Sequence, residues 1–323
     1  MTQPSASAGK RIVQASRASA ILFGLLAARE DRRPWLLPAN ICTVVPLTFL
    51  KARVPFELVD ITPGTLNMDL QHVLRRLERS PCGGILFAHP YGQEYTPEDF
   101  FGEVKSRHPD MTLIDDRCLC VPGLVPRASF ADVTLYSTGY SKIVDLGTGG
   151  YAFIADTLPY RPPELPFAPR DYEAIMQAIK DSVQRNTRFV YRECDWLDTR
   201  HEPPPWSDYS ARIGDALEDS LKHRAAINAI YAAALPAEIQ LPSSFQHWRF
   251  NIRVDDKQRI LDAIFAAGLF ASSHYASLAG IVTEGRAPHA ETLHGEVINL
   301  FNDHRFDPRS AERACRLITA RRP

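Results

Sequence analysis

The amino-acid sequence predicts an α/β protein with a mainly parallel sheet in its first half and a smaller α+β unit at its C-terminal end. Helix and strand patterns alternate over the first 160 residues. Several strand patterns are apolar on both faces, as in Gly84–Ala88 (GILFA), which is typical of a parallel sheet that helices cover on each side. A proline-rich connection at 158–169 then separates this region from the rest of the chain.

The first half is predicted to begin with a buried helix. Ala18–Arg29 is rich in alanine and leucine and is apolar around much of its circumference. The next predicted helix, Thr43–Ala52, has Pro46 near its first turn, where proline is tolerated. Two further helices are expected at Asp69–Arg79 and Glu98–Arg107. The expected strands are Trp35–Ala39, Phe56–Asp60, Gly84–Ala88, Met111–Asp115, Val133–Ser137 and Gly150–Ala155.

The second half is predicted to be helical before it ends in a smaller mixed unit. Ile213–Ala234 has the apolar spacing of a long amphipathic helix. We expect three parts, namely a large domain at residues 1–160, a connecting helical segment at 161–235 and a small C-terminal α+β domain at 236–323. The elements expected in the last part are strand Trp248–Val254, helix Asp256–Ala267, strand Leu269–His274 and helix Arg309–Ala320.

The composition argues against two classes of partner. The 323 residues carry a net charge of −1, which gives no electrostatic reason to expect nucleic acid or an anionic membrane. No apolar run approaches the roughly 20 residues needed to cross a bilayer. The start, Met1–Gly9, is polar and small and lacks the apolar stretch of a signal peptide. We therefore expect a cytoplasmic protein.

The six cysteines are typical of reduced thiols in that compartment. They are scattered along the chain, and only Cys118 and Cys120 are close together. This C-x-C spacing lacks the second cysteine pair that would complete a zinc site. We expect buried thiols and no metal.

An acidic pair follows a predicted strand. Asp115 and Asp116 come directly after Thr112–Ile114, and the carboxyl ends of strands form the ligand-binding crevice of open α/β sheets. A carboxylate buried there stays ionised only when it is paired with a cation or a strong donor, such as a protonated pyridine nitrogen. The alternative interpretation is an aspartate that caps a helix or a turn.

A lysine follows the next strand. Lys142 ends the segment STGYSK after Val133–Tyr136, and the hydroxyls of Ser137 and Ser141 flank it, as a phosphate contact would require. A lysine at the end of a buried strand is costly unless it is neutralised, paired or covalently used. An ordinary surface lysine is the alternative.

A glycine-rich turn follows the lysine. Gly147-Thr148-Gly149-Gly150 leads directly into a strand. Its glycines permit positive φ and the close approach of the backbone to a ligand or to neighbouring backbone. A tight turn without a ligand is the alternative.

In combination, Asp116, Ser137, Lys142 and the glycine turn resemble the DegT/DnrJ/EryC1/StrS family of sugar aminotransferases. The resemblance implies pyridoxal phosphate (PLP) as cofactor and the aspartate-aminotransferase-like fold, fold type I. Further segments of the chain resemble the family in the same order. These are Arg17–Ile21, Leu37–Ala39, Pro55–Asp60, His89–Gln93, Ser273–Tyr275 and Glu296–Leu300 with His304.

The resemblance implies roles for the cofactor-binding residues. Lys142 would bind PLP as a Schiff base and, once released, would move a proton between substrate and cofactor. Asp116 would keep the pyridine nitrogen protonated. The backbone amides of Ala18 and Ser19 and the hydroxyl of Ser137 would hold the phosphate.

The resemblance also implies a substrate pocket and a reaction. The residues implied to line the pocket are His89, Tyr91, His274 and Tyr275, and a core histidine bonded to backbone is the alternative for either histidine. The implied reaction moves an amino group from an amino acid, glutamate, to a keto-sugar carried on a nucleotide. The implied assembly is a homodimer with both active sites at its interface.

The chain departs from the family at three positions. Arg17-Ala18 stands where the family has Gly-Thr, Leu119 stands where it has Gln or His, and Cys42 stands where an aromatic ring stacks on the cofactor. These departures motivate a second hypothesis, a PLP enzyme with lyase, racemase or carbon–carbon chemistry on an amino acid. A third hypothesis is a non-catalytic member that binds a nucleotide-sugar or a protein. Retention of Lys142 and Asp116 speaks against the third, since pure binding requires neither.

Overall fold

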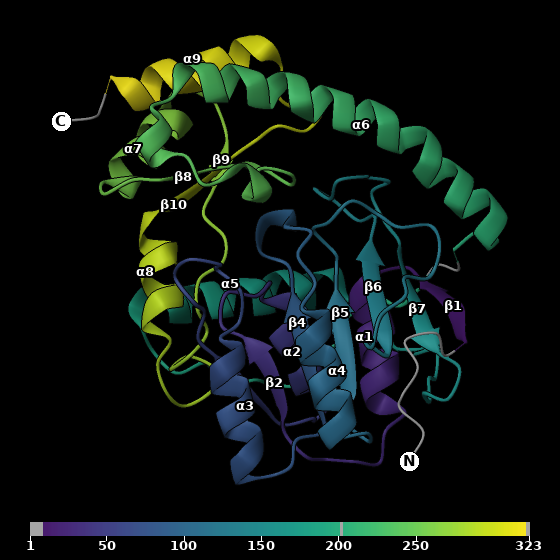
Figure 1. Ribbon diagram of the computed structural model, residues 1–323. Helices are drawn as coiled ribbons and strands as arrows, with labels where there is room; N and C mark the ends of the chain where they lie inside the picture. Colours follow the sequence, from purple (N-terminus) through teal and green to yellow (C-terminus); the bar gives the residue numbers. More distant parts are fainter. Residues whose placement is uncertain (1–8, 201–202, 321–323) are drawn as a thin grey trace.

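A seven-stranded sheet forms the centre of the computed structural model, which describes residues 9–200 and 203–320 (Figure 1). The polar start of the chain, to which the expectation about a signal peptide refers, therefore lies almost entirely outside the described residues. The strand order is β1-β7-β6-β5-β4-β2-β3. The strands are β1 (Lys10–Ala15), β2 (Trp35–Pro38), β3 (Phe56–Val59), β4 (Gly84–Ala88), β5 (Thr112–Asp116), β6 (Val133–Ser137) and β7 (Gly150–Ala155).

The sheet is mainly parallel, as predicted. Strands β3, β2, β4, β5 and β6 run in the same direction, whereas β7 is antiparallel to β6 and β1 is antiparallel to β7. The carboxyl ends of β1, β5 and β6 therefore meet at one edge of the sheet, where side chains that follow these strands come together.

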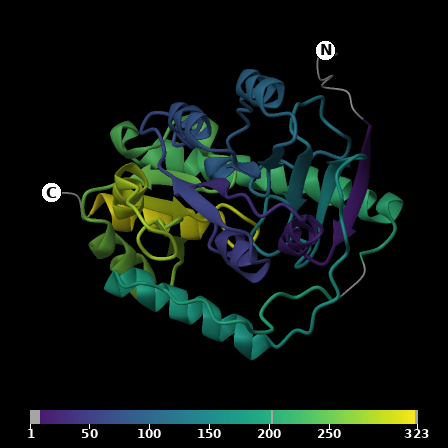
Figure 2. The same cartoon turned by 90° about the horizontal axis from the view of Figure 1, so that it is seen from below.

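Helices cover both faces of this sheet (Figure 2). On one face α1 (Ala18–Ala27) and α2 (Val44–Lys51) share an apolar core with the strands. On the other face α3 (Leu70–Arg79) and α4 (Glu98–Arg107) form a second core. Helix α5 (Pro169–Arg185) packs outside α2. The central strands, such as β2, β4 and β5, are thus buried on both sides, which explains the continuous apolar runs in the sequence.

A second, three-stranded antiparallel sheet lies beyond the carboxyl edge of the first, in the order β8-β10-β9 (Figure 1). Its core includes side chains of the helices around it. The elements of this part are α6 (Trp206–Ala234), β8 (Phe250–Arg253), α7 (Lys257–Ala266), β9 (Ala271–Ser272), α8 (Pro288–Glu296), β10 (Val297–Leu300) and α9 (Pro308–Thr319). Short 3₁₀ turns occur at η1 (Pro90–Gly92), η2 (Ala237–Ile239) and η3 (Ser243–Phe245).

Helix α6 connects the two sheets. Its first half packs Tyr209 and Ile213 against β7, and its second half packs Ile227 and Tyr231 against β8 and α9. In Figure 1 it arches over the carboxyl edge of the large sheet. None of the described helices is long and apolar enough to span a membrane.

Several predicted boundaries need correction. Helix α6 begins at Trp206 rather than Ile213, because its first turns cover β7. The strand expected at Leu269–His274 pairs with β10 only at Ala271–Ser272. The sequence analysis did not predict β1, α8 or β10, and it gave no bounds for α5 within the segment at 161–235 that it expected to be helical. The division of the chain at residues 160 and 235 stays a prediction.

Gly150 lets β7 pass directly beside the start of α1. A Cβ atom on Gly150 would collide with the backbone of Arg17 and Ala18. In the sheet, Gly150 is paired with Ala15 of β1 on one side and with Ser137 of β6 on the other. The absence of a side chain therefore brings the first turn of α1 next to the end of β6.

We expect Gly150→Ala to lower the free energy of unfolding by about 1–3 kcal/mol, because the added methyl group meets backbone that cannot yield easily. Gly295→Ala is the matched control. Gly295 lies in α8 with open space around its Cα, so the same substitution there should raise stability by about 0.5–1 kcal/mol. Urea unfolding of both variants measures whether each substitution lowers or raises the free energy of unfolding. Equal effects would contradict the role assigned to Gly150.

Candidate functional site

A cavity of 320 Å³ lies at the carboxyl edge of the large sheet. All six residues that the sequence analysis assigned to cofactor binding line this cavity, although they come from four separate segments of the chain. They are Ala18, Ser19, Cys42, Asp116, Ser137 and Lys142. The fold therefore brings the predicted residues together.

The first turn of α1 forms one wall of the cavity. Arg17 precedes the helix with extended backbone, and the helix begins at Ala18. The first amide N–H groups of a helix have no acceptor within the helix, and they carry its positive dipole end. The start of α1 lies beside Ser137 because of Gly150, so a helix terminus and a hydroxyl face the same space. This combination suits an anion such as a phosphate.

Asp116 is a buried carboxylate without a cation. It ends β5 and is 8% exposed, and its Oδ1 accepts a hydrogen bond from the backbone N–H of Cys118 at 3.0 Å. It forms no ion pair with any residue in the described part of the chain. A buried carboxylate gains stability from a cation or strong donor, so the site suits a ligand that carries a protonated nitrogen.

Asp115 faces away from Asp116 because successive side chains of a strand point to opposite faces. Its Oδ1 lies 2.5 Å from Nε2 of His89, and its Oδ2 lies 3.7 Å from Arg117. Nδ1 of His89 is 2.8 Å from the carbonyl oxygen of Gln93. Both ring nitrogens of His89 thus have protein partners, as in the alternative of a core histidine. A substrate role for His89 stays a prediction.

The Lys142 side chain lines the same cavity as Asp116. Its ammonium group has no hydrogen-bond acceptor and no ion-pair partner among the described residues. The thiol of Cys118 lies close enough to respond to both charges. Burial raises the pKa of Cys118 well above its ordinary value, and the Asp116 carboxylate adds to this, while Lys142 opposes it. Cys118 is therefore a neutral thiol.

A smaller cavity of 40 Å³ adjoins the first and shares residues with it. Cys42, Asp116 and Lys142 line both cavities. Of the predicted substrate residues, His89 and Tyr275 also line the smaller cavity. The small side chain of Cys42 thus borders both cavities, at the position where the resemblance implies an aromatic ring in other proteins.

Tyr91 and His274 line neither of these two cavities. Tyr91 is buried and donates a hydrogen bond from its hydroxyl to the carbonyl oxygen of His274 at 2.8 Å. The ring of His274 lies against the rings of Trp248 and Tyr275. These contacts give both residues a place in the packing behind the smaller cavity.

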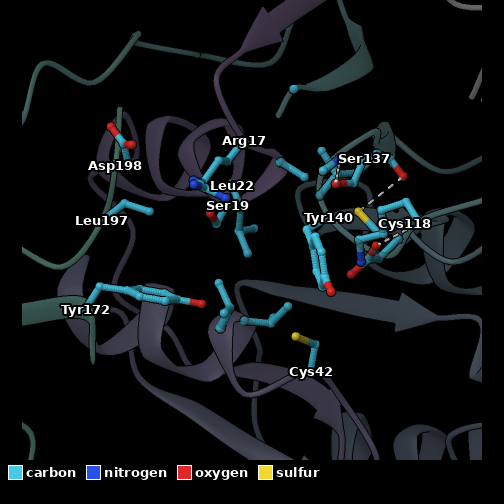
Figure 3. Close-up of a pocket in the computed structure, with 18 of the residues that line it drawn as sticks. Arg17, Ser19, Leu22, Cys42, Cys118, Ser137, Tyr140, Tyr172, Leu197 and Asp198 are labelled. Atoms are coloured by element: carbon cyan, nitrogen blue, oxygen red, sulfur yellow. Dashed lines mark hydrogen bonds between the residues drawn. The ribbon is translucent and has the colours of Figure 1, made fainter. Parts of the chain in front are cut away.

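The sequence analysis missed a group of aromatic and polar residues that complete the larger cavity. Figure 3 shows Tyr140 and Tyr172 on opposite sides of the cavity, with the Tyr172 hydroxyl pointing toward its middle. Asp198 lies to the left of Arg17 in the same view. No local pattern predicts these contacts, because α5 and residues 196–198 reach the cavity only through the tertiary fold. The further lining residues from this region are Phe167, Trp196 and Leu197.

The comparisons with known proteins gave matches among solved structures. No protein-family model and no curated protein matches the sequence. DesI, solved in the presence of its TDP-sugar product, has a TM-score of 0.70 and 16% identity and covers 97% of this chain and 80% of that one. A DegT DnrJ EryC1 StrS aminotransferase from Brucella abortus has a TM-score of 0.66 and 15% identity, with coverage of 96% and 86%.

A third match is a Streptococcus pneumoniae protein in its PLP form. Its TM-score is 0.68 and its identity 16%, and it covers 96% of this chain and 86% of that one. At such identities the likeness shows the fold. The prediction of an aspartate-aminotransferase-like, type I fold is therefore confirmed.

We expect His274 to make stability depend on pH. Burial, followed by the positive charges of Arg249 and Lys142, lowers the pKa of His274 to about 4. In the unfolded chain its pKa is about 6.5, so the native state binds fewer protons between these values. The stabilisation is complete above pH 6.5 and is lost as the pH falls toward 4. It amounts to at most about 3.5 kcal/mol, since one pKa unit corresponds to about 1.4 kcal/mol.

The measurement is the free energy of unfolding from pH 4 to pH 8, for the wild type and for His274→Gln. The wild-type curve should fall more steeply below pH 6.5 than that of the variant. Parallel curves would show that His274 is not held neutral in the folded protein.

Proposed function

We propose that the chain is a PLP-dependent aminotransferase of the DegT/DnrJ/EryC1/StrS family that transfers an amino group from glutamate to a nucleotide-linked keto-sugar. The observation that carries the proposal is that one acidic and one basic side chain line the same cavity and neither has a partner of opposite charge in the described part of the chain. The Asp116 carboxylate lacks a cation, and the Lys142 ammonium lacks an acceptor, among the described residues. PLP would supply a partner to both residues. Its basic ring nitrogen would carry the proton that faces Asp116, and its aldehyde would react with the amine of Lys142.

The chain's own residues fit the other parts of the cofactor. The start of α1 and the Ser137 hydroxyl face the cavity and suit the phosphate. Cys42 and Cys118 line both adjoining cavities and leave room for a flat ring. The cavity volume of 320 Å³ lies at the lower end of the range for ligand sites, which spans roughly 300–1,000 Å³.

When bound, PLP supplies an electron sink that stabilises negative charge at the α-carbon of an amino acid. Asp116 keeps a proton on the ring nitrogen, which this role requires. Lys142 would hold the cofactor covalently through its side-chain nitrogen, and the same nitrogen, once free, would move the α-proton. Aromatic and apolar side chains around Tyr172, including Phe167 and Trp196, form one wall of the space where the substrate would lie.

The acceptor is proposed from the solved structures. DesI was solved with a TDP-sugar product, and its structure resembles this chain over most of its length. Tyr140 and Tyr172 are exposed to 65% and 40% at the cavity, and aromatic faces of this kind suit a sugar ring. A homodimer, a cytoplasmic location and roles for His89, Tyr91, His274 and Tyr275 at the substrate belong to the same proposal.

The absorbance spectrum with PLP tests the proposal directly. We expect a visible band in the wild type that disappears when glutamate is added, because the amino group passes to the cofactor. Lys142→Ala should remain folded by circular dichroism, lack the covalent band and lose turnover. A band that glutamate leaves unchanged would favour a PLP enzyme of another reaction type. Absence of any band in the wild type would refute PLP binding at Lys142.

Asp116→Asn separates the role of the ring nitrogen from binding. The amide keeps the size of the carboxylate but not its charge, so we expect the visible band to persist while the rate with glutamate falls by roughly 100-fold. Asp115→Asn is the control at the neighbouring position. Its side chain faces His89, so it should lower stability more than the rate of amino transfer. Equal rate losses in both variants would contradict the assignment of Asp116.

A further inference from the structure

We propose that Trp248 and Arg249 are positioning residues for Lys142, which they hold in place through Ser141. The inference rests on the proposed function, in which Lys142 binds PLP. It assigns a role to two residues outside the cavity. Neither side chain lines the 320 Å³ cavity, and both precede β8 in the C-terminal part of the chain.

The loop that carries Lys142 is closed on itself. Asp145 accepts hydrogen bonds from the backbone N–H groups of Ser141 at 2.8 Å and of Gly147 at 2.9 Å. Arg305 donates to the same carboxylate at 2.8 Å. Ser141 has a φ of 63°, in the left-handed region that non-glycine residues rarely adopt. Such a backbone persists only where its surroundings hold it.

Two buried donors hold Ser141 from the side of the small sheet. Nε1 of Trp248 donates to the Ser141 carbonyl oxygen at 2.6 Å. Nη2 of Arg249 donates to the Ser141 hydroxyl at 2.8 Å. Trp248 is 3% exposed and Arg249 is 2% exposed. Both the backbone and the side chain of the residue before Lys142 are therefore bonded in a setting where an unmade hydrogen bond is costly.

The arginine that holds Ser141 is itself fixed. Its Nη1 forms a buried ion pair with Asp303 at 2.8 Å, and its guanidinium lies 3.5 Å from the ring centroid of Phe301. Burial lowers the pKa of Arg249, but the Asp303 carboxylate opposes this shift. Arg249 thus remains a charged group with a single set of partners, which is what a positioning role requires.

Lys142 is held on its other side by Arg224 of α6. Nη2 of Arg224 donates to the Lys142 carbonyl oxygen at 2.9 Å, and Nη1 donates to the Trp248 carbonyl oxygen at 2.6 Å. The backbone of Lys142 is therefore bonded to the same region as Ser141. Because the Lys142 ammonium has no hydrogen bond of its own among the described residues, its position depends on this backbone.

The test compares two cofactor forms. PLP has an aldehyde that bonds to Lys142, whereas pyridoxamine phosphate has an amine and binds without that bond. We expect Ser141→Ala and Trp248→Phe each to weaken PLP by on the order of 10-fold, because the lysine is displaced from the aldehyde. Their affinity for pyridoxamine phosphate should stay at the wild-type value. The pH midpoint of the visible PLP band should shift as well. Kd values come from fluorescence titration.

Two variants serve as matched controls. Ser129→Ala removes a serine hydroxyl that lies away from the lysine loop, and Trp35→Phe replaces a buried indole whose N–H, unlike that of Trp248, has no partner among the described residues. In both variants, the ratio of the Kd for PLP to the Kd for pyridoxamine phosphate should equal the wild-type ratio. Ser141→Gly relieves the strained φ while it removes the hydroxyl, so weakening of PLP in this variant excludes backbone strain as the cause. Arg249 itself is left intact, because its loss would leave Asp303 buried and unpaired.

An unchanged ratio of the two affinities in Ser141→Ala and Trp248→Phe would overturn the positioning role and leave the proposed function standing. Equal weakening of PLP and pyridoxamine phosphate would overturn it too, because it would mean a general loosening of the cavity. Absence of a PLP band in the wild type would overturn both proposals together. Selective weakening of PLP supports the positioning role.

Discussion

The pairing of Gly150 with two strand ends holds the candidate site together. On one side it aligns the end of β1, from which α1 starts, and on the other it aligns the end of β6, which leads to the lysine loop. A side chain at this position would separate these segments. The helix terminus, the Ser137 hydroxyl and the Lys142 loop therefore share one cavity because a single residue has no Cβ atom. The electrostatic complementarity of the site follows from that geometry.

The two neighbouring aspartates at the end of β5 differ in their partners. Asp116 and Asp115 leave β5 on opposite faces, and they meet different surroundings. Asp115 is bonded to His89 through Oδ1 and lies within ion-pair distance of Arg117 through Oδ2, so its partners are groups of the protein itself. Asp116 faces the cavity with one backbone donor. Adjacent residues of the same chemistry thus differ in surroundings, because Asp115 is bonded within the protein whereas Asp116 lines the cavity.

Much of the fold could be predicted from the sequence because its signals are local. The apolar strand runs and the amphipathic pattern of α3 depend on nearest neighbours, and Asp116, Ser137 and Lys142 lie at or just after strands that such patterns locate. The predictions for Ala18, Ser19 and Cys42 depended on the family resemblance. The missing parts depend on contacts between distant segments. Strand β1 is only half-buried and α5 follows a series of prolines, so neither has a clear pattern. Tyr172 and residues 196–198 reach the cavity through tertiary packing alone.

The anchoring of the lysine loop has a consequence for how the protein is made. Ser141 and Lys142 leave the ribosome early, but Arg224, Trp248, Arg249 and Asp303 are synthesised long afterwards. The hydrogen bonds that the first three of these residues make to Ser141 and Lys142 can therefore form only after the C-terminal segment has been synthesised and has folded back onto the large sheet.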